Sequence, residues 1–242
     1  QPPSTASAGG ALVATDPLAG SFIDVLRDRL SLAEAGVTFL TGLVGDVDIP
    51  KQTGETTEYW LGEGEDGTES EITLGTVTMV PHTVAIATPI TRRMLLQSTP
   101  GIEALVRNDM VNRVARAIHK AALPGHASPK APTSVRAQIV GSAINWTAAG
   151  APTFEEMVAL ETAVASANAD ADNMRYIYNA VTSGKLKTTK IDAGSGRFVE
   201  EMGEVNGYAR TRSNQIANFE AFFGDFSKVV IGMWSGLDLS VD

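Results

Sequence analysis

Two stretches of β-strand character flank a glycine-rich acidic segment, and this arrangement constrains the fold more than any other feature of the sequence. The run at residues 44–50 is of β type, and the run at residues 72–80 alternates apolar residues with Thr at the period of two that is typical of β-strands. Residues 54–71 between them supply turn-forming glycines and acidic side chains. The sequence therefore predicts a long two-stranded excursion, with a strand out, an acidic tip and a strand back.

Charge is distributed unevenly along the chain. Its 242 residues carry 19 Lys and Arg against 28 Asp and Glu, a net charge of −9. No basic residue lies between Lys51 and Arg92, and seven acidic residues do: Glu55, Glu58, Glu63, Glu65, Asp66, Glu69 and Glu71. The next segment reverses the sign, with Arg92, Arg93, Arg107, Arg113, Arg116 and Lys120 against two acidic residues. Such segments can pair within one chain or between copies, or the first can be a solvated loop and the second a helix with a basic face.

Composition excludes several classes of protein. With 43% hydrophobic and 19% charged residues, the chain can bury a substantial core. No stretch has the length of an apolar membrane span, and residues near Gln1 lack the layout of a signal peptide, so we expect a soluble protein. The absence of cysteine rules out disulfides and thiolate metal sites. The negative net charge argues against binding nucleic acid over the whole surface.

Helices are predicted on both sides of the excursion. Residues 1–15 are rich in Pro, Ser, Ala and Gly and cannot pack a core unaided, so we expect an arm. Asp16 and Pro17 suit the start of a short amphipathic helix with apolar residues at four-residue spacing, namely Leu18, Phe22, Leu26 and Leu30. Thr99 and Pro100 suit the start of a long helix that continues to about Leu123.

The second half of the chain predicts a mixture of short elements. Residues 153–156 form a capping-box pattern ahead of a helix with apolar Met157, Leu160 and Val164. Residues 174–179 suit a buried strand, and Thr182 is expected to cap a helix that continues to Lys190. Turns are expected at residues 192–196 and 206–207.

Four phenylalanines near the end have helical spacing: Phe219, Phe222, Phe223 and Phe226. Because Gly224 interrupts this pattern and residues 226–234 are rich in β-branched side chains, we expect these rings to flank a turn into a core strand at 226–234.

No motif predicts a catalytic, cofactor or metal site. Residues 62–67 match GxGxxG, but carboxylates occupy the variable positions and a strand-like run follows, so a diphosphate would be repelled. The same carboxylates lack the ligand order of a Ca²⁺ loop. His82, His119 and His126 are not spaced as metal ligands, and we expect each to be a surface or packing residue. A hydrolase that uses scattered carboxylates stays open as an alternative.

The order of these segments resembles a known family. Residues 89–106 read PITRRMLLQSTPGIEALV, follow the acidic excursion and lead into the long helix. This arrangement resembles the major capsid proteins of tailed double-stranded DNA phages, which have the Hong Kong ninety-seven, or Johnson, fold. The resemblance implies an α+β fold over nearly the whole chain, and it depends on order and spacing because no single motif in it is diagnostic.

The resemblance implies a division of the chain into the parts of that fold. The N-terminal arm would be residues 1–18 and the E-loop residues 46–80. The peripheral domain would comprise 19–45 and 81–130, with a spine helix at 99–123. The axial domain would be 131–236, and 237–242 would start a return to the peripheral domain.

Family members usually continue beyond such a return, so we expect a chain shortened at its C-terminus, and the start at Gln1 suggests that an upstream segment is missing as well. In the family that segment often serves as scaffold and is removed by a protease. Some relatives join subunits through an E-loop lysine and an asparagine. Lys51 is the only lysine in residues 46–80 and lies at the base of the excursion, so we predict no such crosslink.

Finally, the resemblance implies a function. The chain would form hexamers and pentamers of an icosahedral virion head that encloses DNA without sequence-specific binding, with no reaction, cofactor or membrane. It would assemble in the bacterial host cytoplasm with a scaffolding segment, a maturation protease and a portal as partners. An encapsulin, a cellular compartment of the same fold, is the structural alternative. We expect intersubunit contacts between two sets of side chains: Glu63, Glu65, Asp66, Glu69 and Glu71 of one copy, and Arg92, Arg93, Arg107 and Arg113 of the next.

Overall fold

The computed structural model describes residues 32–234 except 55, 59, 65, 68–70, 90–101, 140, 142, 147–149, 151, 170, 172 and 195, and it leaves out the side chains of 102–104 and 107. The short helix predicted over residues 18–30 therefore lies outside the described residues. The chain forms two compact units. The first comprises Gln1–Thr38 and Val84–Val230, and the second comprises Phe39–Thr83 and Ile231–Asp242.

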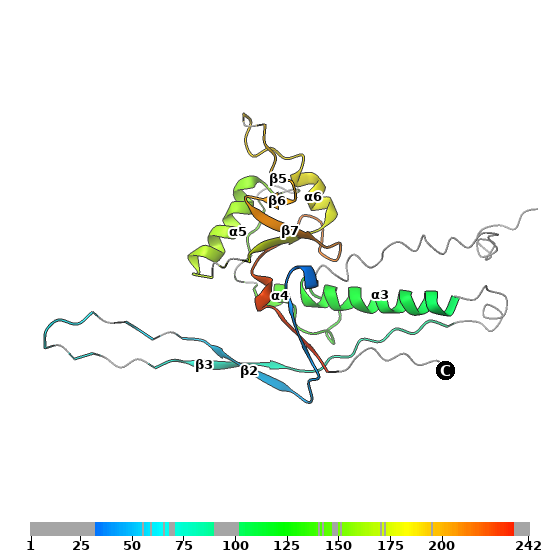
Figure 1. The fold of residues 1–242 in the computed structure, drawn as a ribbon, viewed down its shortest axis with the longest axis horizontal. Helices are drawn as coiled ribbons and strands as arrows, with labels where there is room; N and C mark the ends of the chain where they lie inside the picture. The colour runs from blue at the N-terminus through cyan, green and yellow to red at the C-terminus, as the bar shows by residue number, and fades with distance from the viewer. Residues whose placement is uncertain are drawn as a thin grey trace, which may run out of the picture. The chain divides into compact units, whose positions relative to one another are not determined.

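The second unit contains the predicted excursion. Strands β2 (Val47–Gln52) and β3 (Leu74–Met79) pair antiparallel, from Val47 opposite Met79 to Gln52 opposite Leu74 (Figure 1). Beyond them, the backbone N–H groups of Thr53 and Gly54 donate to the carbonyl oxygen of Thr73. The two-stranded excursion predicted from the period-two pattern is thus confirmed.

A second pair of strands lies at the base of the excursion. Strands β1 (Thr38–Thr41) and β9 (Val230–Met233) form their own two-stranded sheet. A side chain at Gly232 would meet Met79 Cε at 2.8 Å and Leu43 Cδ1 at 2.9 Å, so β9 packs closely against the end of β3. The indole N–H of Trp234 also donates to the carbonyl oxygen of Gly45 at 2.5 Å.

The first unit contains a five-stranded mixed sheet in the order β5-β6-β7-β4-β8. Its members are β4 (Arg175–Tyr178), β5 (Glu200–Glu201), β6 (Glu204–Val205), β7 (Tyr208–Arg212) and β8 (Ala221–Gly224). Strand β4 is parallel to β7 and antiparallel to β8. Strand β4 confirms the buried strand predicted at residues 174–179.

Two-residue turns connect β5, β6 and β7. Asn206 and Gly207 both have positive φ, at 50° and 84°, which is the conformation that an Asn-Gly hairpin turn favours. This turn was expected from the sequence. Met202 and Gly203, with φ of 51° and 93°, form a similar turn that no sequence signal predicted.

Four α-helices are described in the first unit: α3 (Ile102–Ala122), α4 (Val135–Gln138), α5 (Phe154–Ser166) and α6 (Ala180–Leu186). Helix α3 is the long helix predicted to end near Leu123. The capping box at the start of α5 is complete. The Thr153 hydroxyl accepts from the backbone N–H of Glu156, and the Glu156 carboxylate accepts from that of Thr153.

The prediction for α6 was wrong at both ends. Asn179, and not Thr182, is the N-cap, because its side-chain oxygen accepts from the backbone N–H of Thr182 at 2.7 Å and from the Thr182 hydroxyl at 2.8 Å. The helix ends at Leu186 and does not continue to Lys190. Thr182 is fully buried, and its hydroxyl donates to Asn179 instead of accepting from a backbone N–H of the first turn, as an N-cap would.

The prediction for residues 226–234 was right about a strand and wrong about its extent. Phe226–Lys228 form a 3-10 turn, η4, which Asp225 caps, and β9 starts only at Val230. Phe222 and Phe223 lie in β8, so the helical interpretation of the phenylalanine spacing is excluded, as the sequence indicated. Strand β8, which contains these two rings, lies at one edge of the five-stranded sheet and ends at Gly224, before the predicted strand would begin.

The core of the first unit lies between the five-stranded sheet and the helices α5 and α6. It is built from buried Met157, Tyr176, Tyr178, Leu186, Val199 and Val205. The Phe223 ring packs against those of Tyr176 and Tyr208, with centroids 4.5 Å and 5.2 Å away. The hydroxyl of Tyr176 donates to the carbonyl oxygen of Met157 and to the Glu161 carboxylate, and this fixes α5 to the sheet.

Candidate functional site

The two faces of the β2–β3 excursion differ in chemistry. Opposite residues of an antiparallel pair share a face, so Val47, Met79, Ile49 and Val77 make one face apolar. The next pair along, on the other face, is polar, and the Thr78 hydroxyl donates to Asp48 at 2.6 Å. An isolated two-stranded hairpin is at best marginally stable in water. The apolar face is therefore suited to packing against another surface.

The tip of the excursion combines acidic and large apolar side chains. Glu63, Asp66 and Glu71 are exposed, whereas Glu65 and Glu69 lie outside the described residues. Trp60 is 97% exposed. Gly64, in the middle of the tip, has φ of 91°, which a residue with a side chain rarely adopts. The GxGxxG pattern therefore forms a turn between strands, and the residues described after it continue into β3 with no helix.

Helix α3 presents the described part of the basic segment. Arg113 is exposed, and its Nε donates to Asp109 Oδ2 at 2.8 Å, one helical turn away. Arg92 and Arg93 lie outside the described residues, as does the side chain of Arg107. Of the predicted contact residues, only Glu63, Asp66, Glu71 and Arg113 thus have described side chains, and the acidic three belong to a different compact unit from Arg113.

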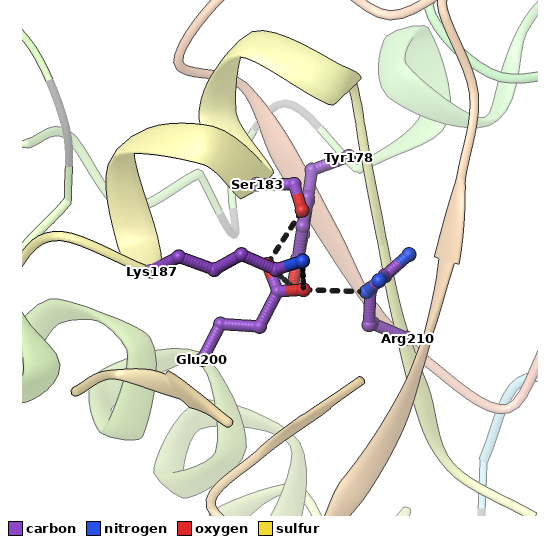
Figure 2. Close-up of polar contacts among 5 residues, drawn as sticks. All are labelled: Tyr178, Ser183, Lys187, Glu200 and Arg210. Atoms are coloured by element: carbon purple, nitrogen blue, oxygen red, sulfur yellow. Dashed lines mark hydrogen bonds and ion pairs between the residues drawn. The ribbon is translucent and has the colours of Figure 1, made fainter. Parts of the chain in front are cut away.

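The most closely connected polar cluster in the described residues surrounds Glu200 at the start of β5 (Figure 2). Its carboxylate has no exposed surface. Oε1 accepts from Arg210 Nε at 2.7 Å and lies 3.8 Å from Lys187 Nζ. Oε2 accepts from the hydroxyls of Ser183 at 2.7 Å and Tyr178 at 3.1 Å. The cluster joins β4, α6, β5 and β7.

The Glu200 cluster affects the protonation of the Tyr178 hydroxyl. Burial raises the pKa of the Tyr178 hydroxyl well above its ordinary value of 10, and the Glu200 carboxylate raises it further. Tyr178 therefore remains a neutral hydrogen-bond donor at every ordinary pH. Glu200 has both oxygens engaged and no access to solvent, so it is suited to holding the fold together and cannot serve as a base toward a bound molecule.

A second buried pair resembles catalytic groups only in residue type. His119 Nδ1 in α3 and Ser213 Oγ after β7 lie 3.4 Å apart, and both side chains are buried. The Ser213 oxygen also accepts from the backbone N–H of Gln215. A nucleophile must reach its substrate, so this pair connects α3 with the end of β7 and performs no chemistry. The structure confirms the prediction that His119 is a packing residue.

The described part of the chain has neither a cluster of metal ligands nor a membrane-spanning helix. No group of three His, Cys, Asp or Glu residues there could hold a metal ion. No helix there has the length and apolar character needed to cross a bilayer. The Glu200 cluster, which is the most elaborate site, had no sequence signal because its members are up to 32 positions apart, from Tyr178 to Arg210.

This mixture of helices and sheet is the fold of phage capsid proteins. Solved structures that share it include the capsid of a native GTA particle, with a TM-score of 0.68 and 21% identity over 92% of this chain and 82% of that one. A structure from Mycobacterium phage Cain has a TM-score of 0.66 and 18% identity over 95% of this chain and 78% of that one.

The chain belongs to the phage capsid family, whose pattern matches residues 9–242. The major capsid protein of Halomonas phage phiHAP-1 is 38% identical over 238 residues, which cover 98% of this chain and 39% of the relative. That of Klebsiella oxytoca phage phiKO2 is 24% identical over 249 residues, covering 95% of this chain and 57% of the relative. The chain therefore spans about two fifths of the length of the first relative and somewhat over half of the length of the second. The resemblance seen in the sequence is confirmed, and so is the prediction of a structural, non-enzymatic protein.

Proposed function

We propose that this chain is the shell-forming part of a major capsid protein, which assembles into the hexamers and pentamers of an icosahedral head that encloses phage or prophage DNA. The single observation that carries the proposal beyond family membership is the β2–β3 excursion. It exposes large apolar side chains on a two-stranded ribbon that cannot bury them alone. In a repeating shell, each copy can lie on its neighbour, and this contact would bury the exposed apolar side chains.

The parts of the chain are assigned by the same proposal. The excursion within residues 46–80 is the E-loop, α3 within 99–123 is the spine helix, and the five-stranded sheet with α5 and α6 lies in the axial domain at 131–236. Residues 19–45 and 81–130 form the peripheral domain. Residues 1–18 are the arm, and 237–242 begin the return to the peripheral domain.

Contact between copies is proposed to join opposite charges. The acidic tip, represented by Glu63, Asp66 and Glu71, would face the basic segment that includes Arg113 in the next copy. Exposed pairs are each worth only about 0–1 kcal/mol, but they repeat at every contact of a shell and are screened by salt. Assembly should therefore be sensitive to ionic strength.

The proposal also covers where the protein assembles and with which partners. A virion location, assembly in the bacterial host cytoplasm, and a scaffolding segment, a maturation protease and a portal as partners are all part of the proposal. DNA is enclosed and not specifically bound. The relatives are phage capsid proteins, which favours a phage head over an encapsulin or a hydrolase. Lys51 lies in β2, so the proposal keeps the prediction that it forms no crosslink.

Negative-stain microscopy and light scattering of the purified protein test this function. Closed particles, tubes or capsomers are expected at low salt, with fewer at high salt. Reversal of Glu63, Asp66 and Glu71 to Lys should abolish assembly, and reversal of Glu155, which is exposed on α5, should not. A chain that stays monomeric at all concentrations would refute the shell function, and assembly indifferent to salt and to the triple reversal would refute the charge contact alone.

A further inference from the structure

Trp60 is the large apolar side chain of the excursion that is most exposed. Tryptophan is on average one of the most buried residues, yet this indole is 97% exposed. Its neighbour Leu61 is partly covered by the tip, because Leu61 Cδ1 lies 3.4 Å from the position that a Cβ of Gly67 would take. Trp60 has no such cover. Its exposure therefore serves nothing within the excursion and indicates a partner.

The charge around Trp60 restricts what that partner is. Glu58, Glu63 and Asp66 are exposed and lie within six positions of Trp60 in the sequence, and none of them forms an ion pair with a described basic residue. An exposed aromatic ring can stack on nucleic acid bases or enter a lipid surface, but an acidic setting repels phosphates and anionic headgroups. The chemistry favours a protein surface that is basic and partly apolar.

Helix α3 has a surface with these properties, because exposed Arg113 and Lys120, with half-buried Arg116, outnumber Asp109 on one face. Leu105, Asp109 and Arg113 follow at four-residue spacing and so share one face of the helix. Leu105 is exposed, and the Arg113 side chain is 62% exposed. Arg113 Nε donates to Asp109 Oδ2 at 2.8 Å, which restricts the guanidinium while most of the side chain stays exposed. A guanidinium face held in this way is a good surface for an indole to stack on.

We propose that Trp60 of one copy is the apolar anchor of shell assembly and packs on the Leu105–Arg113 face of α3 in a second copy. This inference rests on the proposed shell function and adds the side chains that determine the strength of the contact. In this contact the acidic residues near Trp60 in the sequence meet the basic residues near Arg113. Such an arrangement, a buried aromatic centre within a charged rim, is the usual form of a binding hot spot.

Intrinsic fluorescence during assembly of the full chain tests the anchor directly. The chain has three tryptophans, and Trp146 and Trp234 already donate to backbone carbonyl oxygens in the unassembled chain. We expect a blue shift of the emission as particles form, and loss of that shift in Trp60→Phe. Trp60→Ala should raise the protein concentration needed for assembly by about tenfold or more, as removal of an aromatic hot spot does.

Two controls make the result specific. Ile72→Ala also removes an exposed apolar side chain near the tip and should change the assembly concentration by less than Trp60→Ala does. The effects of Trp60→Ala and Arg113→Ala should not be additive, whereas those of Trp60→Ala and Lys120→Ala should be, because Lys120 lies two turns further along α3. Unchanged urea midpoints will show that the variants fold.

Three results would overturn the anchor. If wild-type particles form and Trp60→Ala assembles at the same protein concentration, the shell function stands and the role of Trp60 as anchor is refuted. The blue shift could occur on phosphatidylcholine vesicles without particles, which would assign the indole to a lipid surface. Wild-type protein could also form no particles, which would remove the shell function and the anchor together.

Discussion

Arg210 Nε lies 2.7 Å from Glu200 Oε1 in a site where the carboxylate has no exposed surface and the arginine side chain is only 12% exposed. Glu200 begins β5, at the edge of the sheet, and Arg210 lies in β7, two strands away in the sheet order. The strand between them contributes only Glu204 and Val205. The ion pair therefore fixes two-residue β5 to the longer β7, since β5 is too short to hold its position by backbone hydrogen bonds alone.

Removing the charge of Glu200 should destabilise the chain. In Glu200→Gln the Arg210 guanidinium stays buried without its counter-ion, which costs about 3 kcal/mol of the free energy of unfolding. Urea unfolding of the unassembled chain measures it. Glu204→Gln is the matched control, because its side chain is exposed on the adjacent strand and should change the free energy by less than about 0.5 kcal/mol. Equal effects of the two changes would show that the ion pair contributes nothing.

The capping box of α5 gives a second test. Thr153→Ala leaves the backbone N–H of Glu156 without its side-chain acceptor at the start of the helix and should cost about 1 kcal/mol. Thr162→Ala removes a similar hydroxyl from the middle of the same helix, where it bonds only to the carbonyl oxygen of Val158, and should be close to neutral. Thermal unfolding of both variants followed by circular dichroism distinguishes them, and a neutral Thr153→Ala would contradict the assignment of the cap.

Features that depend on neighbouring residues were predictable from the sequence. The capping box at residues 153–156, the Asn206-Gly207 turn and the paired strands of the excursion each have a local signal with a direct physical cause. The start of α6 shows the limit of such signals. Asn179 and Thr182 can both cap a helix, and the choice was made by tertiary contacts, since the Asn179 amide also donates to the carbonyl oxygen of Ile216 and to Asn218.

The candidate site was predictable only in part, for the same reason. Acidic and basic segments can be counted along the chain, but the exposure of Trp60 depends on how the tip folds around Leu61 and Gly67. The Glu200 cluster joins residues from four separate elements, and no local pattern around any of them indicates that they meet. Long-range pairing of this kind has no periodicity that a sequence could reveal.

Ionisation of the buried tyrosines should be coupled to unfolding at alkaline pH. Burial raises the pKa of Tyr176 and Tyr178 well above 10 in the folded chain. Below about pH 10 both the folded and the unfolded chain keep these protons, so the stabilisation is complete there. Above pH 10 the unfolded chain loses them first, and the free energy of unfolding falls as the pH rises. Tyrosinate absorbance should therefore develop together with unfolding, for two of the four tyrosines.

Tyr178→Phe is the variant that isolates this effect. It should lower the free energy of unfolding by about 1 kcal/mol at neutral pH, because Glu200 loses one donor. Its stability should then fall less steeply above pH 10 than that of the wild type. An identical slope would show that Tyr178 ionises in the folded chain.

Two glycines should respond in opposite ways to the same substitution. Gly207 has φ of 84° in the turn between β6 and β7, a conformation that costs a residue with a side chain about 1 kcal/mol, so Gly207→Ala should destabilise the chain by that amount. Gly184 lies within α6, and a Cβ there meets nothing within 4 Å. Gly184→Ala should therefore stabilise by about 0.5–1 kcal/mol, because alanine loses less backbone entropy in a helix. Urea unfolding of the two variants should differ in sign. Destabilisation by both would mean that the space beside Gly184 is occupied, and a neutral Gly207→Ala would mean that the hairpin tolerates another turn.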